Sequence, residues 1–167
     1  MKEARGDIFY VECDAVCITT NGFVKGNGAA VMGRGCAKQL AQMFPDTPFI
    51  LGNAIKDNGN VTQVILDGRP AVVAFPVKPV SIICTTGDEF VKHMNFVPGE
   101  IIPGFACKAS IDLICDSALR LVEMTNERQW KHVVLPQPGC GYGELSWSDV
   151  KPYLTKILDD RFTCYTF

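Results

Sequence analysis

The chain has 167 residues, of which 47% are hydrophobic and 20% charged, and 16 Lys and Arg against 18 Asp and Glu give a net charge of −2. This length fits one domain with its own core, residues 1–167, without a linker. This charge balance does not indicate binding of a nucleic-acid polymer, although it is compatible with a nucleotide-sized ligand. No apolar run reaches the roughly 18 residues that a membrane span requires.

The N-terminus and the cysteines indicate a compartment. The sequence MKEARGDIF lacks the apolar centre of a signal peptide, so we expect a cytoplasmic protein. The 8 cysteines fall mostly inside apolar runs, which predicts reduced core thiols rather than a disulfide framework. With no CxxC pair and only 2 histidines, far apart, we expect no metal site.

The first third of the chain predicts two strands, a loop and a helix. Short runs of β-branched and apolar residues predict strands at 8–12 and 15–20. The glycine-rich segment 21–35 has little periodicity and predicts a long ordered loop, and 36–44 predicts a helix that ends before Pro45. The turn-rich stretch that follows, PDTPF and LGNAIKDNGN, is expected to run over the surface.

The middle of the chain predicts a hairpin and then an irregular segment. Strands at 61–66 and 71–75 flank the turn AspGlyArgPro, and the second strand is expected to end at Pro76 with Lys78 just beyond it. Residues 79–107 combine prolines, a ThrThrGlyAspGlu turn and scattered aromatics. They predict an elaborated loop or lid rather than regular structure.

The last third predicts a layered α/β architecture. Apolar residues at helical spacing predict a long amphipathic helix at 108–128. A strand at 132–135, a helix from about 147 to 159 and a terminal strand at 162–167 follow. Strands that alternate with helices imply a three-layer α/β domain with its ligand-binding loops at the strand ends.

The stretch 133–147, VVLPQPGCGYGELSW, leads from a buried strand into a glycine-rich loop. Gly139, Gly141 and Gly143 leave backbone N–H groups uncovered by side chains, so the loop could wrap an anion. A tight strand-to-helix turn explains the same glycines. Other motifs of the chain are needed to distinguish an anion-binding loop from a tight turn.

A second glycine-rich loop lies earlier in the chain. It lacks the Gly-Lys-Ser/Thr ending of a P-loop, and GlyAsnGlyAlaAlaVal at 26–31 has valine where a dinucleotide fingerprint needs its third glycine. Both observations disfavour ATP hydrolysis of that type and hydride transfer. GlyArgGlyCysAla at 33–37 runs into a helix N-terminus, where free N–H groups and the helix dipole favour a phosphate.

Five segments in this order and spacing together resemble a macrodomain: GlyAspIle at 6–8, AspAlaValCysIleThrThrAsn at 14–21, ValMetGlyArgGly at 31–35, PheProValLys at 75–78 and LeuProGlnProGlyCysGlyTyrGly at 135–143. Because a lysine follows the Phe-Pro pair, the chain looks most similar to the branch with the DNA ADP-ribosyl glycohydrolase antitoxins and the terminal ADP-ribose glycohydrolases. The resemblance implies a three-layer α/β/α macrodomain with a central mixed sheet, and ADP-ribose bound at one end of the sheet.

The resemblance also implies the ligand contacts. Asp7 would accept a hydrogen bond from the adenine amino group beside the backbone of Ile8, although Asp7 could instead cap a turn or helix. Asn21 would face the distal ribose, or serve as a turn residue. The two phosphate loops would be formed by Val31, Gly33, Arg34 and Gly35 and by Gly139, Cys140, Gly141, Tyr142 and Gly143. Tyr142 could pack on the distal ribose or cover the edge of the core.

Lys78 is the candidate catalytic residue, with Asn21 beside it. An ammonium group that loses solvation has a lowered pKa and can act as a nucleophile or a proton carrier. In the related hydrolases the matching lysine is needed to release ADP-ribose, by attacking the anomeric carbon or by assisting the departure of the leaving group. A solvated lysine at a strand end is the alternative.

Two departures bear on this transfer. Some members of the branch have an aspartate in the second loop, where this chain has Gly143 followed by Glu144; the antitoxin-like members also have glycine there. Residues 79–107 are longer than the connection expected after the lysine. Within them, His93 could act as a general base near Asp88 and Glu89, or lie on the surface.

Two further side chains are expected to have packing roles. Cys140 has no histidine near it in the sequence, which disfavours nucleophilic catalysis, and the resemblance implies that it packs under the loop. Trp147 is expected to anchor the last helix to the sheet.

The resemblance implies binding of ADP-ribose and hydrolysis of an ADP-ribosyl linkage on protein, nucleic acid or a metabolite, without a metal or another cofactor. The partner would be an ADP-ribosylated substrate and not a membrane, with nucleic acid involved only as a modified substrate. A reader module that binds ADP-ribose without turnover is one alternative. A phosphatase acting on ADP-ribose 1″-phosphate is another, but it would need a base to activate water, and the sequence points to no convincing one.

Overall fold

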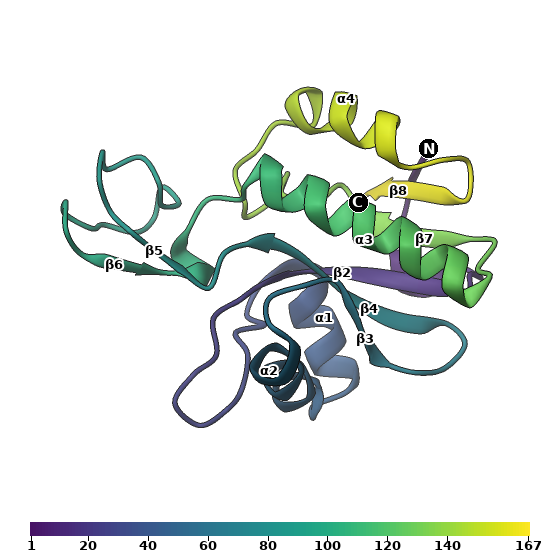
Figure 1. Cartoon of the computed structure of the whole chain (residues 1–167), viewed down its shortest axis with the longest axis horizontal. Helices are drawn as coiled ribbons and strands as arrows, with labels where there is room; N and C mark the ends of the chain where they lie inside the picture. The colour runs from purple at the N-terminus through teal and green to yellow at the C-terminus, as the bar shows by residue number, and fades with distance from the viewer.

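A six-stranded mixed sheet forms the centre of the protein, seen in a computed structural model that describes residues 1–167 (Figure 1). The strand order is β1-β8-β7-β2-β4-β3. Every neighbouring pair is parallel except β3 with β4, which are antiparallel. The strands are β1 (Lys2–Arg5), β2 (Ala15–Asn21), β3 (Gln63–Leu66), β4 (Ala71–Lys78), β7 (Val133–Pro136) and β8 (Phe162–Thr166).

Two helices cover each face of this sheet (Figure 1). One face carries α1 (Gly35–Met43) and α2 (Thr47–Asn58), and the other carries α3 (Ile111–Arg128) and α4 (Trp147–Ile157). Alternate residues of a strand point to opposite faces, so Val16 and Ile18 join the core under α1 and α2 while Cys17 joins the core under α3 and α4. The predicted three-layer α/β fold with a mixed sheet is confirmed.

The N-terminal region differs from the prediction. Residues 8–12 were expected to form a strand, but Ile8–Tyr10 form the short 3-10 helix η1. The Asp7 carboxylate accepts a hydrogen bond from the Phe9 amide and so caps this helix. The edge strand β1, which the sequence analysis missed, pairs instead with β8.

The prediction that the turn-rich stretch runs over the surface is also wrong, because this stretch contains the 12-residue helix α2. Its proline lies in the first helical turn, where the missing N–H costs no hydrogen bond. Leu51 and Ile55 lie one turn apart on one face and are buried against the sheet. Tertiary burial of this face outweighs the local turn signals.

The sequence predicts that strand β4 ends at Pro76. In the structure β4 continues to Lys78, and all its residues are buried. The antiparallel partner β3 begins opposite Ala74, so Pro76 lies where β3 no longer covers that side of β4. A proline is tolerated at such an edge because no ladder hydrogen bond is lost there. Lys78 is therefore the last residue of a buried strand, paired with Asn21 of β2.

Residues 79–107, called the insertion below, are not the irregular loop that was expected. They contain a small antiparallel sheet of β5 (Ser81–Ile83) and β6 (Ile101–Pro103), followed by the 3-10 helix η2 (Gly104–Ala106). Apolar side chains from these elements, with Cys84 and Ile102 at the centre, form a core of their own. The insertion projects from the sheet as a separate lobe (Figure 1).

The remaining predicted elements agree with the structure. The ordered loop before α1, the helix α1, the hairpin of β3 and β4, the long helix α3, the strands β7 and β8 and the helix α4 lie where the sequence predicts them, within a few residues. Trp147 begins α4, packs against the core and donates a hydrogen bond from Nε1 to Glu3 at 2.7 Å. None of the helices combines the length and the apolar character needed to cross a membrane.

Candidate functional site

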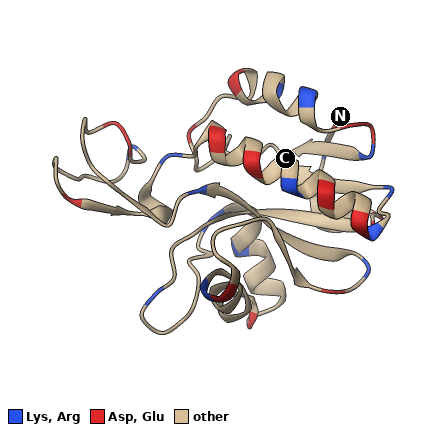
Figure 2. Ribbon diagram, in the orientation of Figure 1, with Lys and Arg blue, Asp and Glu red and all other residues tan.

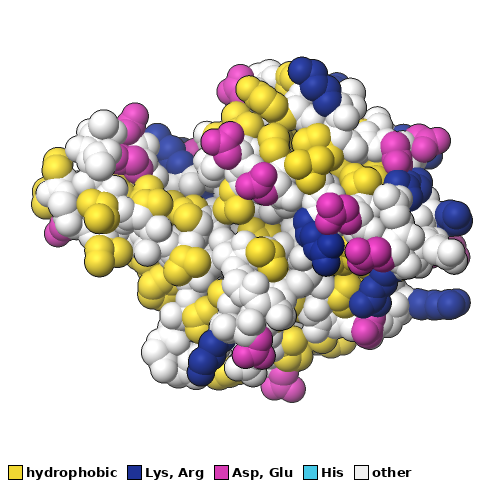
Figure 3. All heavy atoms as spheres, in the orientation of Figure 1, with side chains coloured by type: hydrophobic (Ala, Val, Ile, Leu, Met, Phe, Trp, Pro, Cys, Tyr) yellow, Lys and Arg dark blue, Asp and Glu magenta, His cyan; other side chains and the backbone are white.

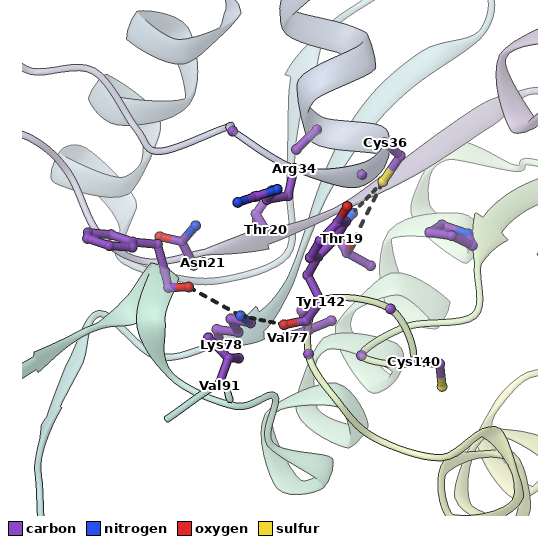
Figure 4. Close-up of a pocket in the computed structure, with 18 of the residues that line it drawn as sticks. Thr19, Thr20, Asn21, Arg34, Cys36, Val77, Lys78, Val91, Cys140 and Tyr142 are labelled. Carbon is purple, nitrogen blue, oxygen red and sulfur yellow. Dashed lines mark hydrogen bonds between the residues drawn. The ribbon is translucent and has the colours of Figure 1, made fainter. Parts of the chain in front are cut away.

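A cavity of about 590 Å³ lies at the edge of the sheet where β2, β4, β7 and β8 all end. These four strands are parallel, so their carboxyl ends meet at one edge, the usual place for a ligand in an α/β fold. The strand ends, two glycine-rich loops and the insertion line the cavity (Figure 4). Of the 26 lining residues, none is Asp or Glu, whereas Arg34, Lys78 and His93 are basic. The cavity therefore suits an anion.

The first loop, residues 31–35, leads directly into helix α1. The Asn21 amide holds the start of this loop, because Nδ2 donates to the Val31 carbonyl and Oδ1 accepts from the Phe23 amide, both at 3.0 Å. No side chain caps the first turn of α1, and Gly35 and Cys36 at this turn line the cavity. Uncapped amides and the helix dipole at this end of α1 are features that favour an anion such as a phosphate.

The second loop, residues 139–143, follows β7 on the opposite side of the cavity. Gly139 has a φ of +78°, and a Cβ there would lie 2.9 Å from the Ile114 side chain, so this turn requires glycine. Tyr142 is 53% exposed and lines the cavity, and the Arg34 guanidinium carbon lies 5.1 Å from its ring centroid. The ring thus contacts the first loop across the cavity instead of covering the edge of the core.

Lys78 lies at the floor of this cavity and is only 8% exposed. Its Nζ donates hydrogen bonds to the Tyr142 carbonyl at 3.0 Å and to the Phe105 carbonyl at 3.3 Å (Figure 4). Burial lowers the pKa of Lys78, and the nearby Cys107 and Glu144 act in the opposite direction. Lys78 is therefore not a solvated lysine at a strand end.

There is no room for a side chain at Gly143, the position where some members of the resembled branch have an aspartate. A Cβ on Gly143 would lie 2.5 Å from the Gly139 carbonyl oxygen and 2.7 Å from the Ala109 Cβ. The neighbouring Glu144 does not line the cavity. Its carboxylate accepts a hydrogen bond from the Lys92 amide of the insertion at 2.9 Å.

The residues expected at the adenine end lie outside the cavity lining. Ile8 is buried in the core, and the Asp7 carboxylate is engaged by the Phe9 amide and by the Gln39 side chain. The structure places Tyr165 and Thr166 at the cavity wall instead. Neither residue was among those predicted from the sequence, although both lie at the carboxyl end of a strand that runs parallel to β7.

The insertion forms the wall beside Lys78 with Val91, His93, Met94 and Phe105. Of these, only His93 was singled out from the sequence. His93 makes no hydrogen bond or ion pair with Asp88 or Glu89, because the Glu89 carboxylate instead accepts from the amides of residues 85–87. Hydrogen bonds from Thr85 and Thr86 hold the pKa of Glu89 far below its usual range.

Cys140 is half-buried and packs against the core beneath the second loop. Burial, with a smaller contribution from Asp149, raises the pKa of its thiol to about 11. At neutral pH the thiol is therefore protonated, which is the wrong state for a nucleophile. Its Sγ donates to the Pro138 carbonyl at 3.5 Å.

Comparison with known proteins identifies the fold of this chain. The sequence matches no family model, and no curated protein matches it as a relative. The macrodomain of Mycobacterium tuberculosis DarG superposes with a TM-score of 0.70 at 19% identity and covers 99% of this chain and 97% of its own. The macrodomain of Thermus aquaticus DarG gives 0.68 at 20% identity over 99% and 97%. Thermosipho africanus DarTG, solved in complex with ADP-ribose, gives 0.66 at 20% identity over 96% of this chain and 39% of its own.

Proposed function

We propose that this chain, which has the macrodomain fold, binds ADP-ribose in the cavity and hydrolyses an ADP-ribosyl linkage with the help of Lys78. The observation that carries the proposal is the place of Lys78. It is a buried lysine at the end of a central strand, on the floor of a basic cavity between two loops with free backbone amides.

Binding follows from the two loops. The diphosphate lies between the first turn of α1 and the amides of residues 141–143, where backbone N–H groups and the Arg34 guanidinium neutralise its charge. A solved neighbour, the Thermosipho africanus DarTG structure, contains ADP-ribose, which supports this ligand. Tyr142 packs on the distal ribose. Asp7 and Ile8, which do not line the cavity, remain the candidates for the adenine end.

The reaction requires cleavage of the bond between the anomeric carbon of the distal ribose and the modified group. In one route the neutral Lys78 amine attacks this carbon, the leaving group departs with its bonding electrons and takes up a proton, and water then releases ADP-ribose from the lysine. In the other route the Lys78 ammonium donates a proton to the leaving atom while water attacks the carbon. Both routes give ADP-ribose and the unmodified partner. Asn21 holds the first loop and faces the same ribose.

One observation favours a reader module as the second candidate. Both hydrogen bonds of the Lys78 Nζ go to backbone carbonyls of the protein, which fits a structural lysine that needs no substrate. The phosphatase alternative finds less support, because the cavity lining offers no Asp or Glu side chain that could activate water.

The proposal is tested with the wild type and Lys78→Ala. Calorimetry should show ADP-ribose binding by both proteins, because the variant replaces no residue of the two loops that hold the diphosphate. Release of ADP-ribose from ADP-ribosylated protein or ADP-ribosylated DNA should fall about 10²-fold or more in the variant, the size of effect expected for a proton-transferring or nucleophilic group.

Thermal melts of both proteins control for folding. Equal release by the two proteins would remove Lys78 from the mechanism. No release by either, with binding intact, would identify a reader, and no binding of ADP-ribose at millimolar concentration would exclude the whole proposal.

A further inference from the structure

Glu144 has an unusual backbone conformation directly after the second loop. Only two non-glycine residues of the chain have a positive φ, Gln129 at +58° and Glu144 at +62°. Gln129 ends helix α3 as its cap, which accounts for its conformation. Glu144 ends no helix, and a non-glycine residue in this region carries a cost of about 1 kcal/mol or more, so other contacts must hold it there.

The side chain of Glu144 supplies such a contact. Its Oε1 accepts a hydrogen bond from the Lys92 amide at 2.9 Å, joining the second loop to the insertion 52 residues away in the sequence. A carboxylate that accepts from a backbone amide forms a charge-assisted bond, stronger than one between neutral groups. The bond connects two segments that both form walls of the cavity.

Both ends of this connection lie next to Lys78. On the loop side, the Tyr142 carbonyl, two residues before Glu144, accepts from the Lys78 Nζ at 3.0 Å. On the insertion side, Val91 and His93 flank Lys92 and line the cavity. The Phe105 carbonyl at the base of the insertion accepts from the same Nζ at 3.3 Å. The two segments that hydrogen-bond to the Lys78 Nζ are thus the two that Glu144 joins.

We propose that Glu144 is a positioning residue that fixes the geometry around Lys78 by joining the second loop to the insertion. The inference rests on the proposed function, since Lys78 is its reacting group. Glu144 does not take the place of the aspartate that some relatives carry one position earlier, because its carboxylate lies outside the cavity lining and points to the insertion. It acts through the Tyr142 carbonyl and through its own charge.

The charge of Glu144 gives a second, separable effect. Cys107 of the insertion and Glu144, directly after the second loop, are the charged partners of Lys78. The other titratable groups that line the same cavity are Arg34, Cys36, His93, Cys140, Tyr142 and Tyr165. Glu144 raises the pKa of Lys78 against the stronger lowering by burial. Removal of this charge alone should therefore move the titration of Lys78 to lower pH.

Two variants separate the hydrogen bond from the charge. Glu144→Gln keeps an oxygen that can accept from the Lys92 amide but loses the charge, whereas Glu144→Ala loses both. Release of ADP-ribose by Glu144→Ala should fall roughly tenfold in kcat with little change in the Kd of ADP-ribose, because positioning of a reacting group affects the chemical step. Glu144→Gln should recover most of kcat, with its pH–rate profile displaced to lower pH.

Two readouts do not depend on turnover. Hydrogen exchange of the Lys92 amide should be faster in Glu144→Ala than in the wild type and near the wild-type rate in Glu144→Gln. The titration of Lys78, followed by NMR of the lysine side chain, should shift to lower pH in both variants. If the wild type releases no ADP-ribose, the proposed function fails while these two measurements still test the role of Glu144. Unchanged Lys92 exchange in Glu144→Ala, or unchanged kcat and Lys78 titration in both variants, would overturn the inference.

Discussion

Gly143 shows how a single missing side chain shapes the second loop. The chain turns back on itself there, so that the Gly139 carbonyl oxygen and the Ala109 Cβ occupy the space of a Cβ. The Gly143 carbonyl also accepts a hydrogen bond from the Ala109 amide at 2.9 Å, which ties the loop to the segment before α3. The glycine is required by this close approach and not by an unusual φ.

Gly143→Ala should therefore destabilise the protein, and Gly141→Ala provides the matched control. A Cβ at Gly143 would overlap backbone atoms that cannot move independently, which costs about 1–3 kcal/mol for overpacking. A Cβ at Gly141 meets nothing within 4 Å, so its free energy of unfolding should stay within roughly 0.5 kcal/mol of the wild type. Urea unfolding of the three proteins measures both changes. Equal stability of the two variants would show that the second loop does not pack as described.

At the scale of elements, the opposite end of the sheet is held by Asp14. Its carboxylate accepts hydrogen bonds from the amides of Lys131 at 2.6 Å and His132 at 2.9 Å, joining the start of β2 to the start of β7. These bonds hold the pKa of Asp14 below its usual range. The contact fixes the register of two central strands whose other ends carry the site.

Asp14→Ala should lower the free energy of unfolding at pH 7 by about 1–3 kcal/mol, since two amides lose a charged acceptor. Because the folded-state pKa of Asp14 is depressed, its contribution is complete above the unfolded-state pKa of about 3.9 and is lost as the pH falls through the folded-state pKa. The stability difference from the wild type should therefore shrink below about pH 4.

Urea unfolding at several pH values checks this dependence. Asp160→Ala is the control, because Asp160 is exposed and makes no hydrogen bond or ion pair. The Kd of ADP-ribose should not change in either variant, because the cavity lies at the other end of the sheet. A difference between Asp14→Ala and the wild type that does not vary with pH would contradict the role of the carboxylate.

At the scale of the whole molecule, charge and apolar surface are distributed differently. Acidic and basic residues are interspersed along the helices and loops (Figure 2), whereas the cavity lining holds basic residues without a carboxylate. The exposed apolar side chains include Ile83 and Ile101, which pair across the small sheet of the insertion. Figure 3 shows apolar side chains on this lobe, at the left of the view. In the cavity lining, therefore, no acidic side chain offsets the positive charge of Arg34 and Lys78.

This distribution predicts weak binding to unmodified nucleic acid. A protein that neutralises several phosphates loses affinity steeply with salt, with a slope of log K against log[salt] near −0.9 for each phosphate. For an unmodified DNA duplex we expect no measurable affinity at about 150 mM salt, and a slope near zero where binding is seen at low salt. Fluorescence anisotropy across a salt series measures both, and a slope of several units would reveal a basic track on another face.

The layers of the fold and the two glycine-rich loops can be predicted from the sequence alone. Apolar periodicity defines α3, α4 and the central strands, because side chains must bury one face of a helix and both faces of a parallel strand. Glycine-rich loops after β2 and β7 then meet at one edge, since parallel strands end together. The fold class and both loops follow from such local patterns.

How the elements close around Lys78 depends on tertiary contacts that the sequence pattern does not show. The helix α2 and the core of the insertion depend on burial against distant segments, which outweighs their prolines and turn residues. The Lys78 Nζ donates hydrogen bonds to carbonyls 27 and 64 residues away in the sequence, and the hydrogen bond of the Glu144 carboxylate joins residues that are 52 positions apart. Local patterns carry no information on such distances, because hydrogen bonds and desolvation arise only when the packed chain brings these groups together.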